Sequence, residues 1–222
     1  MSRFNYQPID RWTILISGFR QTKRHETGTE LVWRRLRQFS EPTHCVVYAS
    51  WRDDWKALAA HIQRCSTEQP IINIVAYSWG VGWGAVRLLN ALESWGLRVC
   101  YLASCDGVSR SPYLPAIIPL NPLSLLSSRT IKVGNVAVVE WCRQRETRPY
   151  GHTIVARKGP RRMSTVEPRI LAPSVIELPH TEIDRHQWFI ATAVRHTSLV
   201  HQRQTPLFNY YSMGQPHATN RP

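Results

Sequence analysis

Short apolar runs rich in β-branched residues alternate along this chain with longer stretches in which apolar residues recur every three or four positions. The short runs are typical of buried strands, and the longer stretches are typical of amphipathic helices. The predicted strands span residues 12–17, 43–49, 71–75, 97–104, 135–142 and 174–178, and the predicted helices span 31–39, 55–62, 81–92 and about 181–200.

Strand and helix follow one another regularly through the first half of the chain. Such alternation predicts a mostly parallel sheet with right-handed crossovers and helices on both faces. We therefore expect an α/β fold, a three-layer α/β/α sandwich, formed by one domain over residues 1–200. Within it, the proline-rich segment 108–130 is either a lid or a loop whose leucines pack onto the core. The polar residues 201–222 predict a flexible tail.

The stretch 71–95 is the most informative, because a predicted strand runs into Ser78 and a helix follows at once. A serine at a sharp strand-to-helix turn presents its hydroxyl outward, and the crowded backbone needs small residues two positions away on either side. Ala76 and Gly80 occupy those positions. The N–H of Trp79 lies at the start of the helix, where it can stabilise an oxyanion. The alternative is an ordinary strand–helix junction whose serine caps the helix.

The pentapeptide A-Y-S-W-G around Ser78 resembles the nucleophile elbow of the α/β-hydrolase family, in its lipase and esterase branch, with alanine for the first glycine. The resemblance covers about residues 11–200. It implies that Ser78 is the nucleophile and that the loop after the first strand supplies a second oxyanion donor. That loop lacks the family's H-G turn, and its candidate donor is the N–H of Phe19. The alternative is a plain turn with Gly18 at positive φ.

Asp106 directly follows the predicted strand 97–104. It therefore lies at the same sheet edge as Ser78, the edge at which open α/β sheets bind ligands. From the residues alone, Asp106 could equally belong to an Asp-Gly turn. The resemblance implies that it is the acid of a catalytic triad. Glu140 and Glu177 are rival acids, but both lie within predicted strands rather than beyond their ends.

His180 follows the last predicted strand, where the resemblance places the catalytic base. In such a triad the histidine takes the serine proton, and the aspartate orients the imidazole. His152 is the main rival base, because it follows the turn after strand 135–142. Just beyond His180, Thr181 and Asp184 have the spacing of a capping box that opens the final helix.

The sequence indicates metal or cofactor binding less strongly than it indicates a serine nucleophile. His180, Asp184 and His186 are near one another in the sequence, but their spacing differs from that of the H-E-x-x-H motif. The chain has neither a P-loop nor a G-x-G-x-x-G motif after a strand. We therefore expect no metal and no cofactor.

The formal net charge of +13 does not change the predicted class of function. The basic residues form separate clusters at 23–25, 34–37 and 157–162 rather than one continuous face with interleaved aromatic residues. We interpret them as solvated surface and predict no specific nucleic-acid partner. Non-specific attraction to acidic partners is the alternative.

The five cysteines form no C-x-x-C pair, and the N-terminal residues contain no apolar leader. No apolar run is long enough to span a bilayer. These features predict a cytoplasmic protein without a transmembrane segment.

The predicted function is that of a serine hydrolase. Ser78, oriented by His180 and Asp106, would cleave an ester-like bond in a small-molecule or lipid-like substrate through an acyl-enzyme. Trp51, Trp79 and Trp83 indicate an aromatic-walled pocket, although core packing explains them equally well. The alternative is a non-catalytic protein of α/β-hydrolase fold that binds an acidic partner or polymer through its basic surface.

Overall fold

A parallel sheet dominates the structure, a computed structural model that describes residues 7–19, 26–109, 130–148, 150–157 and 167–197. Seven strands form the main sheet in the order β2-β1-β3-β4-β6, with β8 and β9 both paired to β6. Every pair in this sheet is parallel. Its strands are β1 (Ile9–Ser17), β2 (His44–Ser50), β3 (Ser66–Tyr77), β4 (Val99–Cys105), β6 (Val136–Arg143), β8 (Arg169–Ile170) and β9 (Ser174–Val175).

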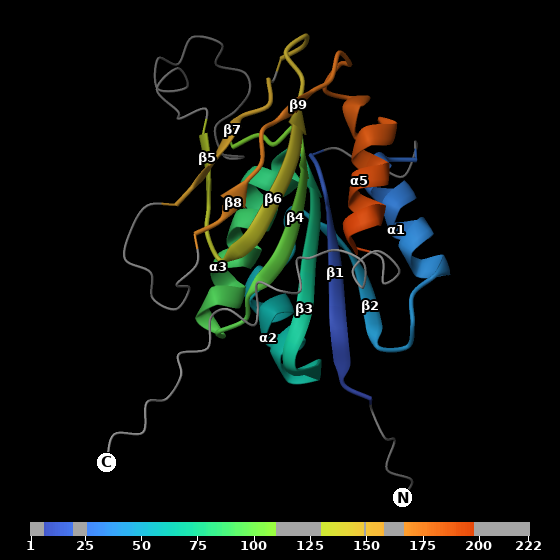
Figure 1. The fold of residues 1–222 in the computed structure, drawn as a ribbon, viewed down its shortest axis with the longest axis vertical. Coiled ribbons are helices and arrows are strands. Elements are labelled where there is room, and N and C mark those ends of the chain that lie inside the picture. The colour runs from blue at the N-terminus through green and yellow to red at the C-terminus, as the bar shows by residue number, and fades with distance from the viewer. Residues whose placement is uncertain (1–6, 20–25, 110–129, 149, 158–166, 198–222) are drawn as a thin grey trace, which may run out of the picture.

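Helices cover both faces of this sheet (Figure 1). On one face, α2 and α3 pack against the strands through a buried aliphatic and tryptophan cluster. On the other face, α1 and α5 pack against each other and the sheet. The predicted α/β fold with three layers is thereby confirmed. The helices are α1 (Gly28–Gln38), α2 (Trp55–Cys65), α3 (Val86–Ser94) and α5 (Gln187–Thr197), with a π-helical segment η1 (Gly80–Ala85) and a 3-10 turn η2 (Ile183–Arg185).

The alternation of side chains along β1 shows how the layers arise. Ile14 and Ile16 point into the cluster beneath α2 and α3, whereas Leu15 points toward α1 and α5. All three side chains are fully buried. A strand covered on both faces is therefore apolar at successive positions, and the continuous apolar run predicted it correctly.

Three short strands were not predicted. Strands β5 (Thr130–Val133) and β7 (Thr153–Ala156) form a separate two-stranded parallel sheet, and β8 has only two residues. Strands this short contain too few positions for a periodic apolar pattern. The serine strand, in contrast, is longer than predicted, because β3 begins at Ser66 and includes Pro70.

The predicted capping box at Thr181 and Asp184 is wrong. Residues 183–185 form the 3-10 turn η2, and α5 begins only at Gln187. The buried Asp184 carboxylate instead accepts a hydrogen bond from the Gly28 N–H, at 2.8 Å, at the N-terminus of α1. A Cβ atom on Gly28 would lie 1.6 Å from the Asp184 carbonyl oxygen, so this contact requires glycine. Asp184 therefore stabilises the start of a distant helix rather than of its own.

Two glycines test the predicted turns. Gly96 has φ of 72° and closes α3, as its position after the helix predicts. Gly18 has no such conformation, since Gly96 is the sole glycine with positive φ in the described ranges. The alternative that Gly18 forms a plain turn at positive φ is thus wrong.

Some predictions fall on residues outside the described ranges. The predicted lid at 108–130 lies there except at its two ends, as do the predicted tail at 201–222 and most of the basic residues at 157–162. None of the five cysteines, all of which lie in the described ranges, forms a disulfide. Across the ranges that are described, no helix combines the length and the apolar character that crossing a bilayer requires.

Candidate active site

Ser78 occupies the sharp turn between β3 and η1 and has φ of 54°. This left-handed conformation is uncommon for a residue with a side chain, and the surrounding backbone must hold it in place. The Ser78 N–H donates to the Cys105 carbonyl at 2.9 Å. The Ser78 carbonyl accepts from the N–H groups of Val81 and Val108, each at 3.0 Å. The turn is therefore fastened to β4 and to the loop that follows β4.

Small residues around Ser78 allow this close packing. A Cβ atom on Gly80 would lie 2.5 Å from the Ile16 carbonyl oxygen, and one on Gly82 would lie 2.2 Å from the Val108 carbonyl oxygen. Both contacts are with backbone, which cannot move aside as a side chain can. Ala76 is fully buried in β3. The spacing of small residues that the sequence shows is thus a steric requirement of the turn.

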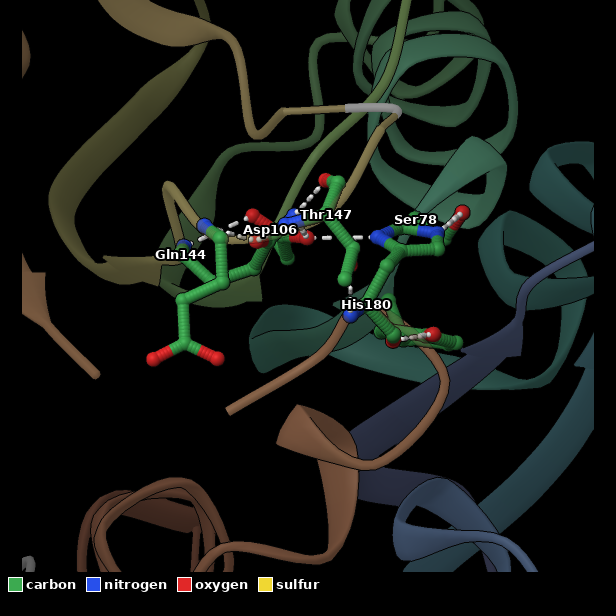
Figure 2. Close-up of polar contacts among 7 residues, drawn as sticks. Ser78, Asp106, Gln144, Thr147 and His180 are labelled. Atoms are coloured by element: carbon green, nitrogen blue, oxygen red, sulfur yellow. Dashed lines mark hydrogen bonds and ion pairs between the residues drawn. The ribbon is translucent and has the colours of Figure 1, made fainter. Parts of the chain in front are cut away.

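His180 lies beside Ser78 although 102 residues separate them. The distance between Ser78 Oγ and His180 Nε2 is 2.9 Å, a hydrogen-bonding distance (Figure 2). The Tyr77 hydroxyl donates a hydrogen bond to the His180 carbonyl, and the two rings stack with centroids 5.3 Å apart. Two consecutive residues, the last of β3 and the first of the turn that follows, therefore hold His180.

Asp106 completes a chain of hydrogen bonds. Its Oδ2 lies 2.5 Å from His180 Nδ1, and its carboxylate is fully buried. A carboxylate only accepts hydrogen bonds, so Nδ1 carries the proton. In neutral His180 the other nitrogen, Nε2, is then free of a proton and accepts from the Ser78 hydroxyl. Asp106 also has a left-handed backbone, with φ of 45°.

The rival residues have other partners. His152 Nδ1 accepts a hydrogen bond from the Ser109 N–H at 3.2 Å. Glu140 accepts from the Tyr101 hydroxyl at 3.0 Å and lies 3.2 Å from His196 Nε2. The hydrogen bond with His196 is the largest influence on the Glu140 carboxyl and lowers its pKa. Glu177 is exposed. The acid that the structure pairs with His180 is Asp106.

The loop after β6 contributes contacts that the sequence did not predict. Gln144 donates to Asp106 from its backbone N–H and from its side chain, and Thr147 Oγ1 accepts from the His180 N–H at 2.9 Å. Gly151 packs directly against the Asp106 carboxylate. In the sequence, residues 143–151 are a charged stretch with turn residues. The one feature that could have indicated their contact with Asp106 and His180 is that they follow a strand that ends at the same sheet edge.

The two predicted oxyanion donors, Phe19 and Trp79, belong to residues that lie next to each other in space. A Cβ atom on Gly18 would lie 3.0 Å from Ser78 Cβ, so the loop after β1 touches the serine turn. The rings of Phe19 and Trp79 pack with centroids 4.5 Å apart. The structure thus brings both residues beside Ser78.

Trp51 joins this pair to form an aromatic cluster of Phe19, Trp51 and Trp79. The Trp51 ring lies 5.8 Å from that of Phe19 and 5.1 Å from that of Trp79. The Arg52 guanidinium lies over the Trp51 ring at 4.6 Å. The Trp83 ring lies beneath the Arg87 guanidinium, at 3.5 Å.

The residues considered for metal binding have separate contacts. Both ring nitrogens of His180 are within hydrogen-bonding distance of Ser78 and Asp106, and Asp184 contacts Gly28. His186 Nδ1 accepts from the Trp188 N–H at 3.2 Å. In the part of the chain that the structure describes, no three His, Cys, Asp or Glu side chains form a group that could hold a metal ion.

A serine hydroxyl that donates to a neutral imidazole, itself bonded to a buried carboxylate, can lose its proton as it attacks a carbonyl carbon. No family model matches this chain, and a search of curated proteins finds no significantly similar sequence.

Proposed function

We propose that this protein is a serine hydrolase of the α/β-hydrolase type that cleaves ester-like bonds. The observation that carries the proposal is the continuous chain of hydrogen bonds from Ser78 Oγ to His180 and from His180 to Asp106, at 2.9 and 2.5 Å. Nucleophile, base and orienting acid are the three roles that covalent catalysis by serine requires.

The proposed reaction begins when Ser78 Oγ attacks the carbonyl carbon of the ester and its proton passes to His180 Nε2. The resulting oxyanion accepts hydrogen bonds from the N–H groups of Phe19 and Trp79. Collapse of the tetrahedral intermediate expels the alcohol, which takes the proton from His180 and leaves Ser78 acylated. Water then attacks the acyl group while His180 Nε2 takes its proton. As the second tetrahedral intermediate collapses, the bond to Ser78 Oγ breaks, the oxygen takes the proton back from His180, and the acid is released. No cofactor enters these steps.

Backbone conformation gives the proposal independent support. Ser78 and Asp106 both have positive φ, in a conformation that costs on the order of 1–3 kcal/mol for residues other than glycine. Such strain clusters at active sites, where the surrounding structure holds it. Of the three non-glycine residues with positive φ in the described ranges, Ser78 and Asp106 are the two whose side chains bond the His180 imidazole. The third, Asn135, lies just before β6, where its side chain bonds the Leu89 and Leu97 carbonyls.

The aromatic cluster indicates the class of ester. Phe19, at 40 % exposure, and the partly buried Trp79 give an apolar surface directly beside Ser78. Apolar and aromatic side chains predominate in small-molecule sites. We therefore propose a small-molecule or lipid-like ester with an apolar group next to the scissile bond.

Labelling with a fluorophosphonate probe tests the proposal, because the probe reacts with an activated serine and needs no knowledge of the substrate. Wild type should be labelled, whereas Ser78→Ala and His180→Ala should not. Ser94→Ala is the matched control, since Ser94 is exposed on α3 and bonds only the Ala91 carbonyl among the contacts resolved. Absence of labelling in folded wild type would contradict the proposal. Salt-dependent binding of acidic polymers would then test the alternative of a binding protein.

A further inference from the structure

Gln144 is a fully buried residue directly after β6 that contacts both oxygens of Asp106. Its backbone N–H donates to Asp106 Oδ1 at 3.0 Å, and its side-chain Nε2 donates to Oδ2 at 3.2 Å. Oδ2 is also the oxygen that accepts from His180 Nδ1. Two hydrogen bonds from one residue therefore orient the carboxylate toward the histidine.

The orientation of the Gln144 amide follows from its other partners. Its Oε1 accepts from the N–H groups of Glu146 and Thr147, at 2.8 and 2.9 Å. Its Nε2 donates to the Thr147 carbonyl at 2.7 Å. A flipped amide would place an NH₂ group against two N–H donors and an oxygen against the Asp106 carboxylate. The amide therefore has one satisfied orientation, in which it donates to Asp106.

The same loop reaches the histidine from the other side. Thr147, whose backbone is held by Gln144, accepts a hydrogen bond from the His180 N–H through its Oγ1 at 2.9 Å. Figure 2 shows Gln144 and Thr147 beside Asp106 and His180. Acid and base, 74 residues apart in sequence, are thus connected through a four-residue loop as well as directly.

We infer that Gln144 is a positioning residue that aligns Asp106 with His180, directly through its own hydrogen bonds and indirectly through Thr147. It bonds Asp106 and holds Thr147, which in turn bonds His180, so it acts on the reaction through the acid and the base. Without the Gln144 side-chain amide, Oδ2 of the buried carboxylate loses a donor, which is costly. The carboxylate then turns toward the donors that remain, the Gln144 backbone N–H on Oδ1 and the His180 ring, and its alignment with the imidazole changes. The effect on rate rests on the proposed function, whereas the effect on alignment does not.

Kinetics provide the first test, with p-nitrophenyl butyrate as substrate. Gln144→Met keeps the length of the side chain but removes the amide, and should lower kcat by about 10- to 100-fold with little change in KM. Thr147→Val removes the acceptor for the His180 N–H on an exposed residue and should lower kcat by about three- to tenfold. Gln63→Met on the exposed face of α2 is the matched control and should match wild type.

A double-mutant cycle separates positioning from a general loss of structure. If Gln144 acts through Asp106, Gln144→Met should cost little more once Asp106→Asn has removed the carboxylate. An equal fold-loss in both backgrounds would overturn the inference, as would wild-type kcat in a folded Gln144→Met protein. If Gln144→Met does not fold, Thr147→Val in the Asp106→Asn background takes its place in the cycle.

Proton NMR gives a readout that does not depend on turnover. A proton shared between His180 Nδ1 and Asp106 should give a far-downfield resonance, assigned by its loss in Asp106→Asn. Gln144→Met should shift or broaden this resonance, and Gln63→Met should leave it unchanged. An unchanged resonance in Gln144→Met would overturn the positioning role. If wild type shows the resonance but neither labels nor hydrolyses esters, the proposed function fails while the resonance still decides the alignment.

Discussion

Gly151 packs against the carboxylate of Asp106 so closely that a Cβ atom on Gly151 would lie 2.1 Å from Asp106 Oδ1. We predict that Gly151→Ala displaces the carboxylate, lowers the fluorophosphonate labelling rate at least tenfold and destabilises the fold by about 1–3 kcal/mol. The matched control is Gly134→Ala, whose nearest neighbour is the flexible end of Arg157 at 3.0 Å. Labelling of Gly151→Ala at the wild-type rate would contradict this steric account.

Asp184 provides a second prediction, since its carboxylate is buried and bonds the first N–H of α1. Asp184→Ala should lower the free energy of unfolding by about 1–2 kcal/mol, because an N-terminal hydrogen bond and a favourable charge at the helix dipole are both lost. Urea denaturation measures the change. Chelators should have no effect on wild type, whereas a metal site that includes Asp184 would give a chelator-sensitive protein.

His44 gives the fold a predicted pH dependence. Burial, and next the positive charge of Arg11, lower the pKa of His44 from 6.5 to about 4, against the opposing effect of Asp10. Below pH 6.5 the unfolded chain therefore binds a proton that the folded protein does not, and stability falls as the pH drops toward 4. The loss approaches an upper limit of about 3 kcal/mol.

Urea denaturation between pH 7 and pH 4 measures this loss. In His44→Asn the free energy of unfolding should fall less between pH 7 and pH 4, because the contribution of this histidine is absent. His61 is exposed, so His61→Asn should keep the pH dependence of wild type. If the free energy of unfolding depends on pH equally in His44→Asn and wild type, other groups cause the acid instability.

The aromatic cluster predicts a preference among esters. Phe19→Ala and Trp51→Ala should raise KM more for p-nitrophenyl octanoate than for the acetate, because the longer acyl chain loses more apolar contact. Trp95→Ala is the control, since Trp95 is 51 % exposed at the end of α3. If both esters are affected equally, the cluster supports the loop after β1 and does not contact the acyl group.

The parts of the site that follow strands could be predicted from the sequence. Ser78 and Asp106 come directly after β3 and β4, two adjacent apolar strands, and parallel pairing brings their ends to one edge. His180 follows the very short β9, and its position depended more on the family resemblance than on periodicity. Where a long apolar run defines a strand, the local sequence thus predicts which side chains follow it and lie at the carboxyl edge of the sheet.

The contacts of Gln144 and Asp184 could not be predicted, because their partners are distant in sequence. Gln144 binds Asp106 across 38 residues, and Asp184 binds Gly28 across 156. At Asp184, the local pattern of a capping box even pointed to the wrong helix. A buried polar side chain bonds to the donors that tertiary packing brings to it, and a single sequence does not contain that information.

The anchoring of residue 184 at the start of α1 also has a kinetic meaning. The contacts that fix Ser78 and its turn have shorter sequence separations, from 27 residues between Ser78 and Cys105 to 64 between Gly80 and Ile16, so they can form earlier. His180 arrives only when a chain closure of 102 residues brings it to Ser78, just as the segment that follows it docks on α1. Closures of that length are slow relative to local contacts. During folding, Ser78 should therefore reach its final position before His180, the base that would activate it. The serine should then become reactive only when the segment around His180 has docked.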